Sequence, residues 1–570
     1  MSSPPRAADD GVDVGLGFDV VVVGSGSAGM AAAIVAALSG LQVLLVEKTA
    51  VFGGATAWSG GGCWVPGNHL MQRAGIADSA EAAARYVRQV VGEALNETLL
   101  ERFLRHSPEM LRYFEQHTQL RFELSGAMPD YQPELAGASK QGRLLVPVEF
   151  DGRQLGPRFA QLRPPLQEFN APGGMMVGFR DADHLMNATR SWRSLRHTLR
   201  LAGRYLMDRL RGYSRGTRLT MGNALAGRLL RSALDARVTL WNHSAATALR
   251  RENGRVVGVQ IDQRGRSRFV QARRGVVLAS GGFSADPVMR AQHIPYADQH
   301  QSLVPEGNTG DGLKMAQAVG AVMNPCNPSN AAWNVISLHQ RRDGSVQKFP
   351  HLFLDKPKPG CIAVNAQALR FGNEASLMFT EAMHASGSVP AWLICDGRFI
   401  RKYGLGLVYP GGYGLWRLVR DGYLIEAPTL AGLAQRLQMP ADALTATVAE
   451  FNRHAAQGKD PRFGRGVSAF DLSMGDPAHR PNPSLGVLEQ TPFYAVKIFP
   501  GDATTTLGLN VDGQGRALDA DGRPIDGLYA CGLDMNSLWA GRPPANGCNH
   551  SLNLTFGYLI ARHLAGAPAE

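Results

Sequence analysis

The sequence predicts an α/β protein in which a parallel β-sheet domain is interrupted by an inserted α+β domain. Three observations lead to this prediction. Residues 20–47 have a strand–helix–strand pattern, the composition changes between residues 287 and 484, and the remaining chain returns to hairpin and buried-strand patterns that complete the first domain. A chain of 570 residues is long enough for two or more such units.

The first element is the stretch VVVVGSGSAGMAAAIVAALSGLQVLLVE, residues 20–47, which carries no charge before its last residue, Glu47. Its length would allow a membrane span, for which about 20 apolar residues suffice. The internal pattern argues against a span. Residues 20–23 are four valines, typical of a buried parallel strand, residues 30–38 form an alanine-rich helix, and residues 43–46 form a second strand.

Three glycines between the first strand and the helix have G-x-G-x-x-G spacing. Gly24 permits a tight turn, Gly26 lets backbone approach a pyrophosphate, and Gly29 lets the helix pack closely on the strand. The free N–H groups of the helix N-terminus favour phosphate. Glu47 follows Gly29 by 18 residues, near the place expected for a carboxylate that binds a ribose hydroxyl. The unit therefore predicts a dinucleotide site.

Further patterns divide the chain. Helices are expected within residues 79–118, strands at 255–261 and 267–280 around a polar turn, and a closing helix near the C-terminus. The predicted parts are a disordered N-terminus at residues 1–16, the nucleotide domain at 17–286 with a basic helical segment at 180–237, a substrate-binding domain at 287–484, and the second part of the nucleotide domain at 485–570.

The formal net charge of +11 is concentrated in the basic segment, which contains 13 arginines and only four aspartates. In its helical pattern, arginines 193, 196, 200, 204 and 211 share one face and leucines 195, 199, 206 and 210 share the opposite one. Two interpretations stay open: a helix packed on the domain, or a helix lying on anionic lipid as a peripheral membrane contact. Nucleic acid is not an expected partner, because no base-reading motif accompanies the arginines.

The N-terminus lacks the basic-then-apolar order of a signal peptide, so a cytoplasmic protein is expected. Six cysteines are scattered without a C-x-x-C motif. No metal site is expected, and the thiols are interpreted as reduced and mostly buried.

Six motifs occur in order: the first βαβ unit, GGATAWSGGG, LASGGFSAD, NTGDGLKMA, GLYACGLDMNS and LTFGYLIARHLAG. Together they resemble the FAD-dependent fumarate reductase/succinate dehydrogenase flavoprotein superfamily, and within it the 3-ketosteroid dehydrogenase branch. The resemblance covers nearly the whole chain. It implies FAD as the cofactor and a Rossmann-like FAD-binding domain, with a parallel sheet, helices and a β-meander, interrupted by an inserted α+β substrate or cap domain.

The resemblance also implies cofactor contacts. The residues that it assigns to FAD are Gly24, Ser25, Gly26, Ala28, Gly29, Glu47, Gly54, Ala55, Thr56, Ser59, Ala245, Ala246, Gly281, Gly282, Asp534, Ser551 and Leu552. Succinate dehydrogenases attach FAD to a histidine ahead of their small-residue loop. The corresponding stretch GGATAWSGGG has none, so non-covalent FAD is expected.

The resemblance implies oxidation or reduction of a C–C bond next to a carbonyl, with proton transfer by tyrosines in the Δ1-ketosteroid dehydrogenases. Tyr131 in MPDYQPE matches one such tyrosine. A second position holds Phe379 or Met378, and the third holds Pro543. Two of the three expected hydroxyl groups are therefore missing.

Other groups near these positions are candidates for proton transfer. We expect Arg542, His550 and Tyr131 to transfer protons and to stabilise the oxyanion, and Tyr413 is a further candidate. Three hypotheses remain: a dehydrogenase of a 3-ketosteroid-like or other hydrophobic cyclic ketone, an enoate reductase in which Arg542 clamps a small unsaturated acid, and a flavin-binding protein without catalysis. The sequence does not identify the electron acceptor.

Overall fold

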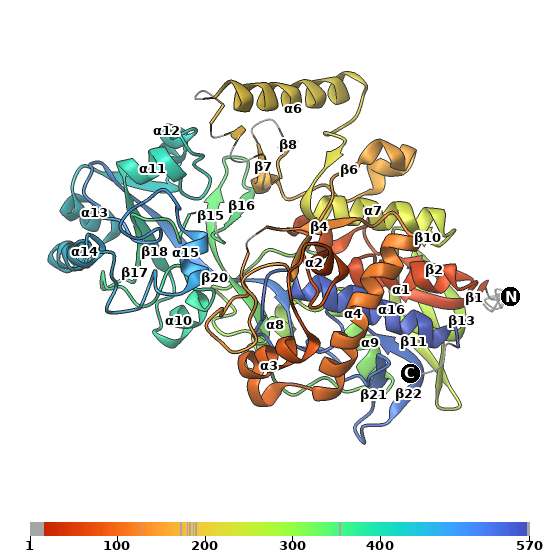
Figure 1. Ribbon diagram of the computed structural model, residues 1–570. Helices are drawn as coiled ribbons and strands as arrows, with labels where there is room; N and C mark the ends of the chain where they lie inside the picture. Colours follow the sequence, from red (N-terminus) through yellow and green to blue (C-terminus); the bar gives the residue numbers. More distant parts are fainter. Residues whose placement is uncertain are drawn as a thin grey trace, which may run out of the picture.

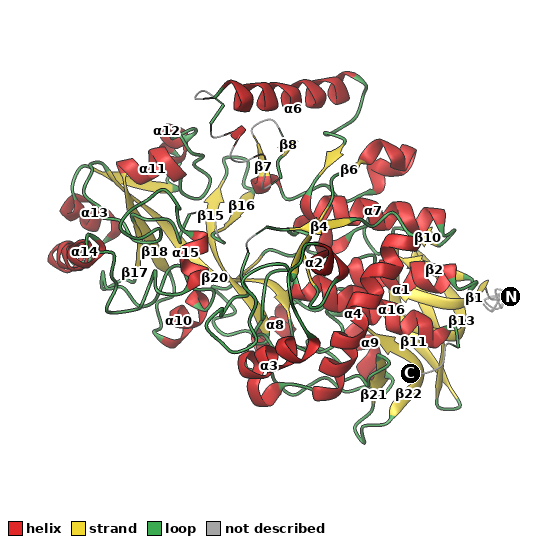
Figure 2. Cartoon of the chain, in the orientation of Figure 1, coloured by secondary structure: helices red, strands yellow, loops and turns green. Residues whose placement is uncertain are grey.

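The computed structural model describes residues 16–126, 128–171, 174–178, 181, 184–185, 187–188, 191–352 and 355–566. Within them, the strands gather into two large sheets, one on each side of the molecule, with helices around both (Figure 1, Figure 2). The predicted N-terminal segment 1–16 lies outside the described residues except for its last residue.

The first sheet contains the predicted βαβ unit. Its strands are β1 (Leu16–Val23), β2 (Val43–Val46), β10 (Thr239–Trp241), β11 (Ser244–Glu252), β12 (Arg255–Gln263), β13 (Arg266–Leu278), β21 (Arg516–Leu518) and β22 (Pro524–Ala530). The order is β10-β2-β1-β13-β12-β11, with β22 beside β13 and β21 beside β22. Strand β1 is parallel to β2 and β13, whereas β11, β12 and β13 form an antiparallel meander. The predicted strands and the meander are confirmed.

Helices cover this sheet and complete the first unit. They are α1 (Ser27–Leu38), α2 (His69–Arg73), α3 (Ala80–Val91), α4 (Glu97–His117), α7 (Met221–Asp235), α8 (Pro287–His293), α9 (Asp311–Ala318) and α16 (Cys548–Leu564). Helix α1 packs against α7 and α16. The contact with α16 requires Gly557, because a Cβ there would lie 2.7 Å from the carbonyl oxygen of Ala28. The C-terminal helix α16 therefore packs closely on α1, near the start of the described chain.

The second sheet belongs to the inserted part. Its strands are β14 (Gln301–Ser302), β15 (Ala331–Gln340), β16 (Val346–Pro350), β17 (Cys361–Val364), β18 (Ala391–Asp396), β19 (Leu424–Ala427) and β20 (Phe493–Thr505). Its helices are α10 (Phe379–Ala385), α11 (Gly397–Tyr403), α12 (Leu415–Arg420), α13 (Leu430–Leu437), α14 (Ala441–Ala455) and α15 (Ala469–Met474). Strand β20 pairs with β14, β15, β18 and β19 and so holds this sheet together.

The hydrophobic cores change from one sheet to the other at residues that differ from the boundaries predicted from composition. The first core includes Ala331 and resumes at Leu507, whereas the cores of the second sheet run from Val335 to Ile498. The composition of the sequence predicts these boundaries at residues 287 and 484, and they stay a prediction. Helix α8 begins at residue 287, and β20 of the second sheet lies beyond residue 484.

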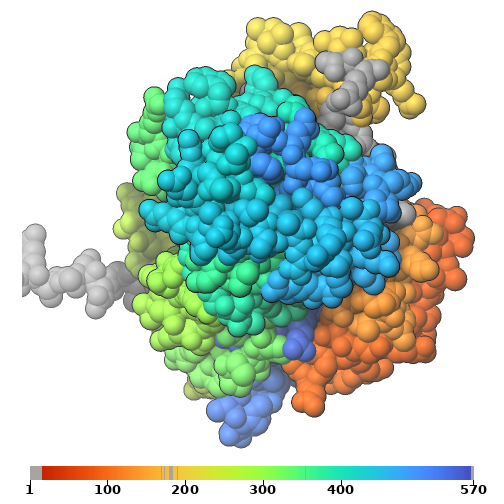
Figure 3. Space-filling view, turned by 90° about the vertical axis from the view of Figure 1, so that its left-hand side faces the viewer, coloured from red at the N-terminus to blue at the C-terminus, as the bar shows by residue number. Residues whose placement is uncertain are grey.

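Seven short strands form three small sheets of their own in the described part of the chain. They are β3 (Cys63–Trp64), β4 (Phe122–Leu124), β5 (Leu144–Pro147), β6 (Phe150–Asp151), β7 (Asn170–Ala171), β8 (Met175–Met176) and β9 (Arg218–Leu219). The predicted basic helix is α6 (Trp192–Leu210), which stands out from the body at the top of Figures 1 and 3. Among the described residues, no helix combines the length and apolar character that a membrane span requires.

Candidate active site

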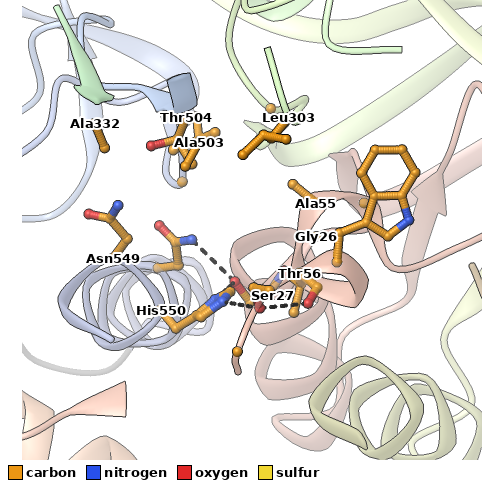
Figure 4. Close-up of a pocket in the computed structure, with 18 of the residues that line it drawn as sticks. Gly26, Ser27, Ala55, Thr56, Leu303, Ala332, Ala503, Thr504, Asn549 and His550 are labelled. Atoms are coloured by element: carbon orange, nitrogen blue, oxygen red, sulfur yellow. Dashed lines mark hydrogen bonds between the residues drawn. The ribbon is translucent and has the colours of Figure 1, made fainter. Parts of the chain in front are cut away.

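A cavity of about 720 Å³ runs between the two sheets. Its walls come from α1, the loop after β2, the start of α16, and strands β15 and β20 (Figure 4). The sequence-predicted residues that line it are Gly24, Ser25, Gly26, Ala28, Glu47, Gly54, Ala55, Thr56, Ser59, Tyr131, Ala246, Gly281 and His550. Most of the residues expected around one ligand therefore meet in one place.

The glycine turn forms a phosphate cradle. At Gly24, where φ is +107°, a Cβ would lie 2.1 Å from the carbonyl oxygen of Ala279, and at Gly29 it would lie 2.0 Å from that of Gly24. These two glycines are required by the protein's own packing. At Gly26 the nearest atom would be Thr56 Oγ1, 3.9 Å away, so the space in front of Gly26 is open to a ligand. The N-cap residue Gly26 has no side chain to cap α1, and in the first turn the Ser27 N–H donates to Thr56 Oγ1 at 3.0 Å.

Glu47 lies at the carboxyl end of β2 and is buried in the wall of the cavity. The Ser25 hydroxyl donates to Glu47 Oε2 at 2.6 Å, and the backbone N–H and hydroxyl of Thr49 both donate to Oε1 at 2.9 Å. A carboxylate has about four acceptor positions, so capacity remains for a ribose hydroxyl. The carboxylate is thus fixed in position beside the cradle.

Several predicted cofactor residues lie next to the cavity without lining it. They are Gly29, Ala245, Gly282, Asp534, Ser551 and Leu552. Ala245 is on β11 between Ser244 and Ala246, which do line the cavity, and alternate residues of a strand point to opposite faces. On α16 the lining residues are Cys548, Asn549, His550 and Asn553, so Ser551 and Leu552 lie on the buried side.

Asp534 supports the cavity from behind. Its Oδ2 accepts from the backbone N–H of Ser280 at 2.5 Å, and its Oδ1 accepts from the Ser280 hydroxyl at 3.0 Å and from the N–H of Gly282 at 3.2 Å. Burial raises the pKa of this carboxyl group. Asp534 thus fixes the second glycine turn, while Ser280 and Gly281 face the cavity.

His550 is held between two serines. Its Nε2 lies 2.8 Å from Ser59 Oγ and its Nδ1 lies 3.2 Å from Ser27 Oγ (Figure 4). The Ser59 hydroxyl donates to the carbonyl of Thr56, so the imidazole donates through Nε2 and accepts from Ser27 at Nδ1. Burial lowers the pKa of His550 to about 4, and the ring is neutral at pH 7. Both ring nitrogens are thus engaged by serine hydroxyl groups, and the role of His550 in proton transfer stays a prediction.

Tyr131 lies in another part of the cavity wall. Its hydroxyl donates to Asn546 Oδ1 at 2.6 Å, and its ring packs edge-on against Phe470 at 5.2 Å between centroids. Burial raises the pKa of the phenol well above its usual value of 10, so it stays protonated at neutral pH. Apolar side chains also line the cavity: Met128, Leu144, Val146, Leu166, Trp333, Pro350, Leu352, Leu377, Met378 and Met474.

The structure distinguishes the two alternatives at the second tyrosine position. Met378 lines the cavity, whereas Phe379 is buried in the core of the second sheet against Phe371. Pro543 also lines the cavity. One turn after Met378 on α10, Glu381 lines the cavity as well, and its Oε1 accepts from the Ser329 hydroxyl at 2.8 Å.

Two predicted catalytic residues lie away from this group. Arg542 is exposed beside Gly92 and does not line the cavity, because neighbouring residues of the loop alternate and Pro543 takes the inward position. Tyr413 is 68% exposed in the loop before α12. Of the four predicted residues, only Tyr131 and His550 therefore meet in the cavity.

The sequence analysis missed several polar groups in the cavity wall. Lys48 pairs with Asp311 at 2.6 Å, and Arg163 lies 5.7 Å from the centroid of the Trp58 ring. The buried Nε of Arg163 has no hydrogen-bond partner among the described residues. Lys358 donates to the carbonyl oxygens of Met474 and Gly475, both at 2.8 Å. Arg163 comes from a segment without a recognisable motif, so only the structure could reveal it.

Comparisons with known proteins agree with this architecture. Residues 19–549 match the family model described as an FAD binding domain. The 3-oxosteroid 1-dehydrogenase of Mycobacterium tuberculosis (strain ATCC 25618 / H37Rv) is 36% identical, with 96% of this chain and 98% of the relative covered. The 4-oxocyclohex-2-ene-1-carboxylate 5-dehydrogenase of Sinomonas cyclohexanicum is also 36% identical, with 96% and 93% covered.

A solved structure extends the similarity to three dimensions. The 3-ketosteroid delta1-dehydrogenase from Sterolibacterium denitrificans, in complex with 1,4-androstadiene-3,17-dione, matches with a TM-score of 0.89 and 34% identity, covering 97% of this chain and all of that one. The family resemblance and the FAD cofactor expected from the motifs are confirmed. The chain belongs to the FAD-binding flavoprotein family, in the branch of the 3-ketosteroid dehydrogenases.

Proposed function

We propose that the protein is an FAD-dependent dehydrogenase that introduces a C=C bond next to the carbonyl of a hydrophobic cyclic ketone of the 3-ketosteroid kind. The observation that carries the proposal is one continuous cavity that joins the glycine cradle to a wall rich in apolar side chains. The names of the relatives support the same reaction class. The inserted domain contributes Trp333, Met378 and Glu381 to this wall, which supports a role in substrate binding.

The residues present fit FAD. The open space at Gly26 suits a pyrophosphate, Glu47 retains acceptor capacity for a ribose, and the unpartnered Nε of Arg163 offers a donor. When bound, FAD supplies the hydride acceptor and passes two electrons to an external acceptor. The protein supplies position and proton transfer.

FAD is expected to be bound without a covalent link. The loop after β2 has no histidine, and both ring nitrogens of His550 are engaged by Ser27 and Ser59. Acid precipitation of the purified protein should therefore release the yellow colour into the supernatant, which absorbance measures directly. Colour retained in the pellet after washing would contradict this expectation.

We assign the stabilisation of the carbonyl oxygen to the Asn546 amide, which Tyr131 positions. The raised pKa keeps the Tyr131 phenol protonated, and its hydrogen bond to Oδ1 orients the Asn546 amide so that Nδ2 remains a donor. Removing a proton next to a carbonyl builds negative charge on the oxygen, and fixed donors stabilise that charge in a site shielded from water.

We assign the removal of that proton to Glu381. Met378 and Pro543 cannot titrate, the nitrogens of His550 are engaged, and the raised pKa of Tyr131 makes it a donor. Glu381 follows Met378 by one helical turn and is oriented by the Ser329 hydroxyl. In the proposed step, Glu381 takes the proton from the carbon next to the carbonyl. FAD held at the glycine cradle would supply the acceptor for the hydride of the adjacent carbon, so that the ketone would lose two electrons and two hydrogens.

The alternative, an enoate reductase with Arg542 as a carboxylate clamp, receives less support. Arg542 is exposed outside the cavity. Lys48 pairs with Asp311 and Lys358 donates to two carbonyls, while Arg163 donates to Thr49 beside Glu47, at the end of the cavity assigned to the cofactor. A small dicarboxylate would therefore lack a free clamp.

An anaerobic experiment tests the function. The purified yellow protein is mixed with saturated 3-ketosteroids and with cyclohexanone-type ketones, and the flavin absorbance is followed. We expect bleaching by a ketone, and no reoxidation of dithionite-reduced protein by small unsaturated acids. Bleaching by no ketone, together with reoxidation by an unsaturated acid, would favour the reductase. If neither response is observed, the result would favour a flavin-binding protein without catalysis.

We further propose that the protein associates peripherally with membranes through the basic helix. The solvent-facing apolar side chains of α6 support this proposal.

A further inference from the structure

Helix α6 turns its apolar side to solvent. Trp192 is 75% exposed, Leu199 and Leu206 are each 59% exposed, and Leu210 is 72% exposed. The residues that face the protein include Leu201 and Asp208, and Asp208 accepts from the backbone N–H and the hydroxyl of Thr217, both at 2.8 Å. A surface helix ordinarily buries its apolar stripe against the core. In α6 that stripe has no partner among the residues that the structure describes.

A second segment adds aromatic side chains on the same side of the molecule. Tyr413 and Trp416, at the start of α12, are 68% and 69% exposed. Helices α6 and α12 both lie toward the top of the molecule in Figure 1. The Tyr409 hydroxyl donates to the carbonyl of Asn170 in β7 at 3.0 Å, which ties the α12 loop to the strands below α6.

Exposed apolar side chains are concentrated in these two segments. Of the 17 large hydrophobic residues that are exposed among the described part of the chain, eight belong to them: Trp192, Leu199, Leu206, Met207, Leu210, Tyr409, Tyr413 and Trp416. Single exposed apolar residues are ordinary, but a concentration of this kind marks an interaction surface. We call these eight residues the apolar platform.

Positive charge accompanies the apolar platform. Arg193, Arg196 and Arg200 are exposed on α6, and none pairs with a carboxylate among the described residues. The Arg420 guanidinium lies 4.7 Å from the centroid of the Trp416 ring. Apolar side chains flanked by arginines fit a surface that offers both hydrocarbon and anionic groups.

We infer that the apolar platform docks the protein onto an anionic lipid bilayer, with α6 lying in the interface and Tyr413 and Trp416 as a second anchor. This inference deepens the proposed membrane contact and is independent of the reaction. Leucine side chains would enter the acyl region while the arginines bind lipid phosphates. A second copy of the chain fits less well, because symmetric pairing would bring two arginine-rich faces of the same sign together.

Vesicle flotation of the FAD-bound protein tests the inference. We expect flotation with vesicles of phosphatidylglycerol and phosphatidylcholine, much less with phosphatidylcholine alone, and a decrease as salt is raised. The triple variant Leu199→Ser, Leu206→Ser and Leu210→Ser should lower the partition coefficient more than about tenfold. Each of Arg193→Gln, Arg196→Gln and Arg200→Gln should lower it about fivefold on anionic vesicles. Trp416→Ala should lower it by a smaller factor.

Controls separate this docking from folding and from the reaction. Val288→Ser alters a side chain that is 63% exposed on α8, outside the apolar platform, and should float like the native protein. All variants should keep the FAD spectrum and the same turnover of a water-soluble ketone. Failure of the native protein to float, or equal losses in the Val288→Ser and triple-leucine variants, would overturn the inference. A native dimer that the leucine changes convert to a monomer would also overturn it, by identifying a second copy as the partner.

Discussion

Replacing Glu381 by glutamine is expected to slow reduction of the bound FAD by a saturated cyclic ketone by about 10²–10⁴-fold, the usual contribution of a positioned acid or base. Glutamine keeps the side-chain length, and its carbonyl still accepts the hydrogen bond from Ser329, but the amide cannot take a proton. FAD content and thermal stability should stay close to native, because the cradle residues are unchanged. Anaerobic stopped-flow absorbance of the flavin measures the effect.

Hydrogen exchange at the ketone isolates the proton step. In D₂O, enzyme whose FAD has first been reduced with dithionite cannot accept hydride, so any deuterium gained next to the carbonyl reports the base alone. We expect the native protein to catalyse this exchange, followed by NMR, and Glu381→Gln to lose it. Glu489→Gln, an exposed carboxylate elsewhere, is the matched control. Native exchange rates in Glu381→Gln would remove Glu381 from the mechanism and leave the reaction class standing.

Replacing Gly26 by valine should produce a folded protein that takes up FAD at least about tenfold more weakly. The φ of Gly26 is −69°, which any residue adopts, and its Cβ would meet no protein atom nearer than 3.9 Å. The side chain would instead occupy the space assigned to the pyrophosphate, and such overpacking costs about 1–3 kcal/mol. Fluorescence titration of the FAD-free protein with FAD gives the affinity, and circular dichroism confirms folding.

The neighbouring glycines provide the contrast. Gly24→Ala would combine a φ of +107° with a Cβ only 2.1 Å from the Ala279 carbonyl oxygen, so it should reduce the free energy of unfolding itself. The two variants therefore separate a glycine needed by the ligand from one needed by the fold. Native FAD affinity in Gly26→Val would show that the pyrophosphate lies elsewhere.

The cofactor half of the site was largely predictable, because its signals are local. The turn at Gly24, the extended valines before it and the start of α1 depend on residues within a few positions of one another. The motif near Asp534 was found too. In the structure its carboxylate accepts hydrogen bonds from Ser280 and Gly282 next to the cavity, and its contact with the cofactor stays a prediction. A short motif shows that a residue matters to a turn without showing which partner it contacts.

The substrate half depended on packing between distant segments. Phe379 and Met378 are equivalent in the motif, and only the insertion of Phe379 into the second core turns Met378 toward the cavity. Glu381 meets Ser329 across 52 residues, and Tyr131 meets Asn546 across 415. Arg542 was expected in the site from its position in the chain, yet the inward orientation of Pro543 directs it to the surface.

Local patterns were therefore enough to predict the βαβ cradle, because glycine conformation and the periodicity of apolar residues act over a few positions. The family and the cofactor followed from the resemblance of six ordered motifs. Which side chains share the cavity, and which side of α6 faces solvent, depended on packing between distant segments. An amphipathic pattern predicts that a helix has one apolar and one polar face, but the neighbours available for packing determine which face is buried. In α6 it is the side with Leu201 and Asp208 that packs, and the other leucines are left for a partner outside the chain.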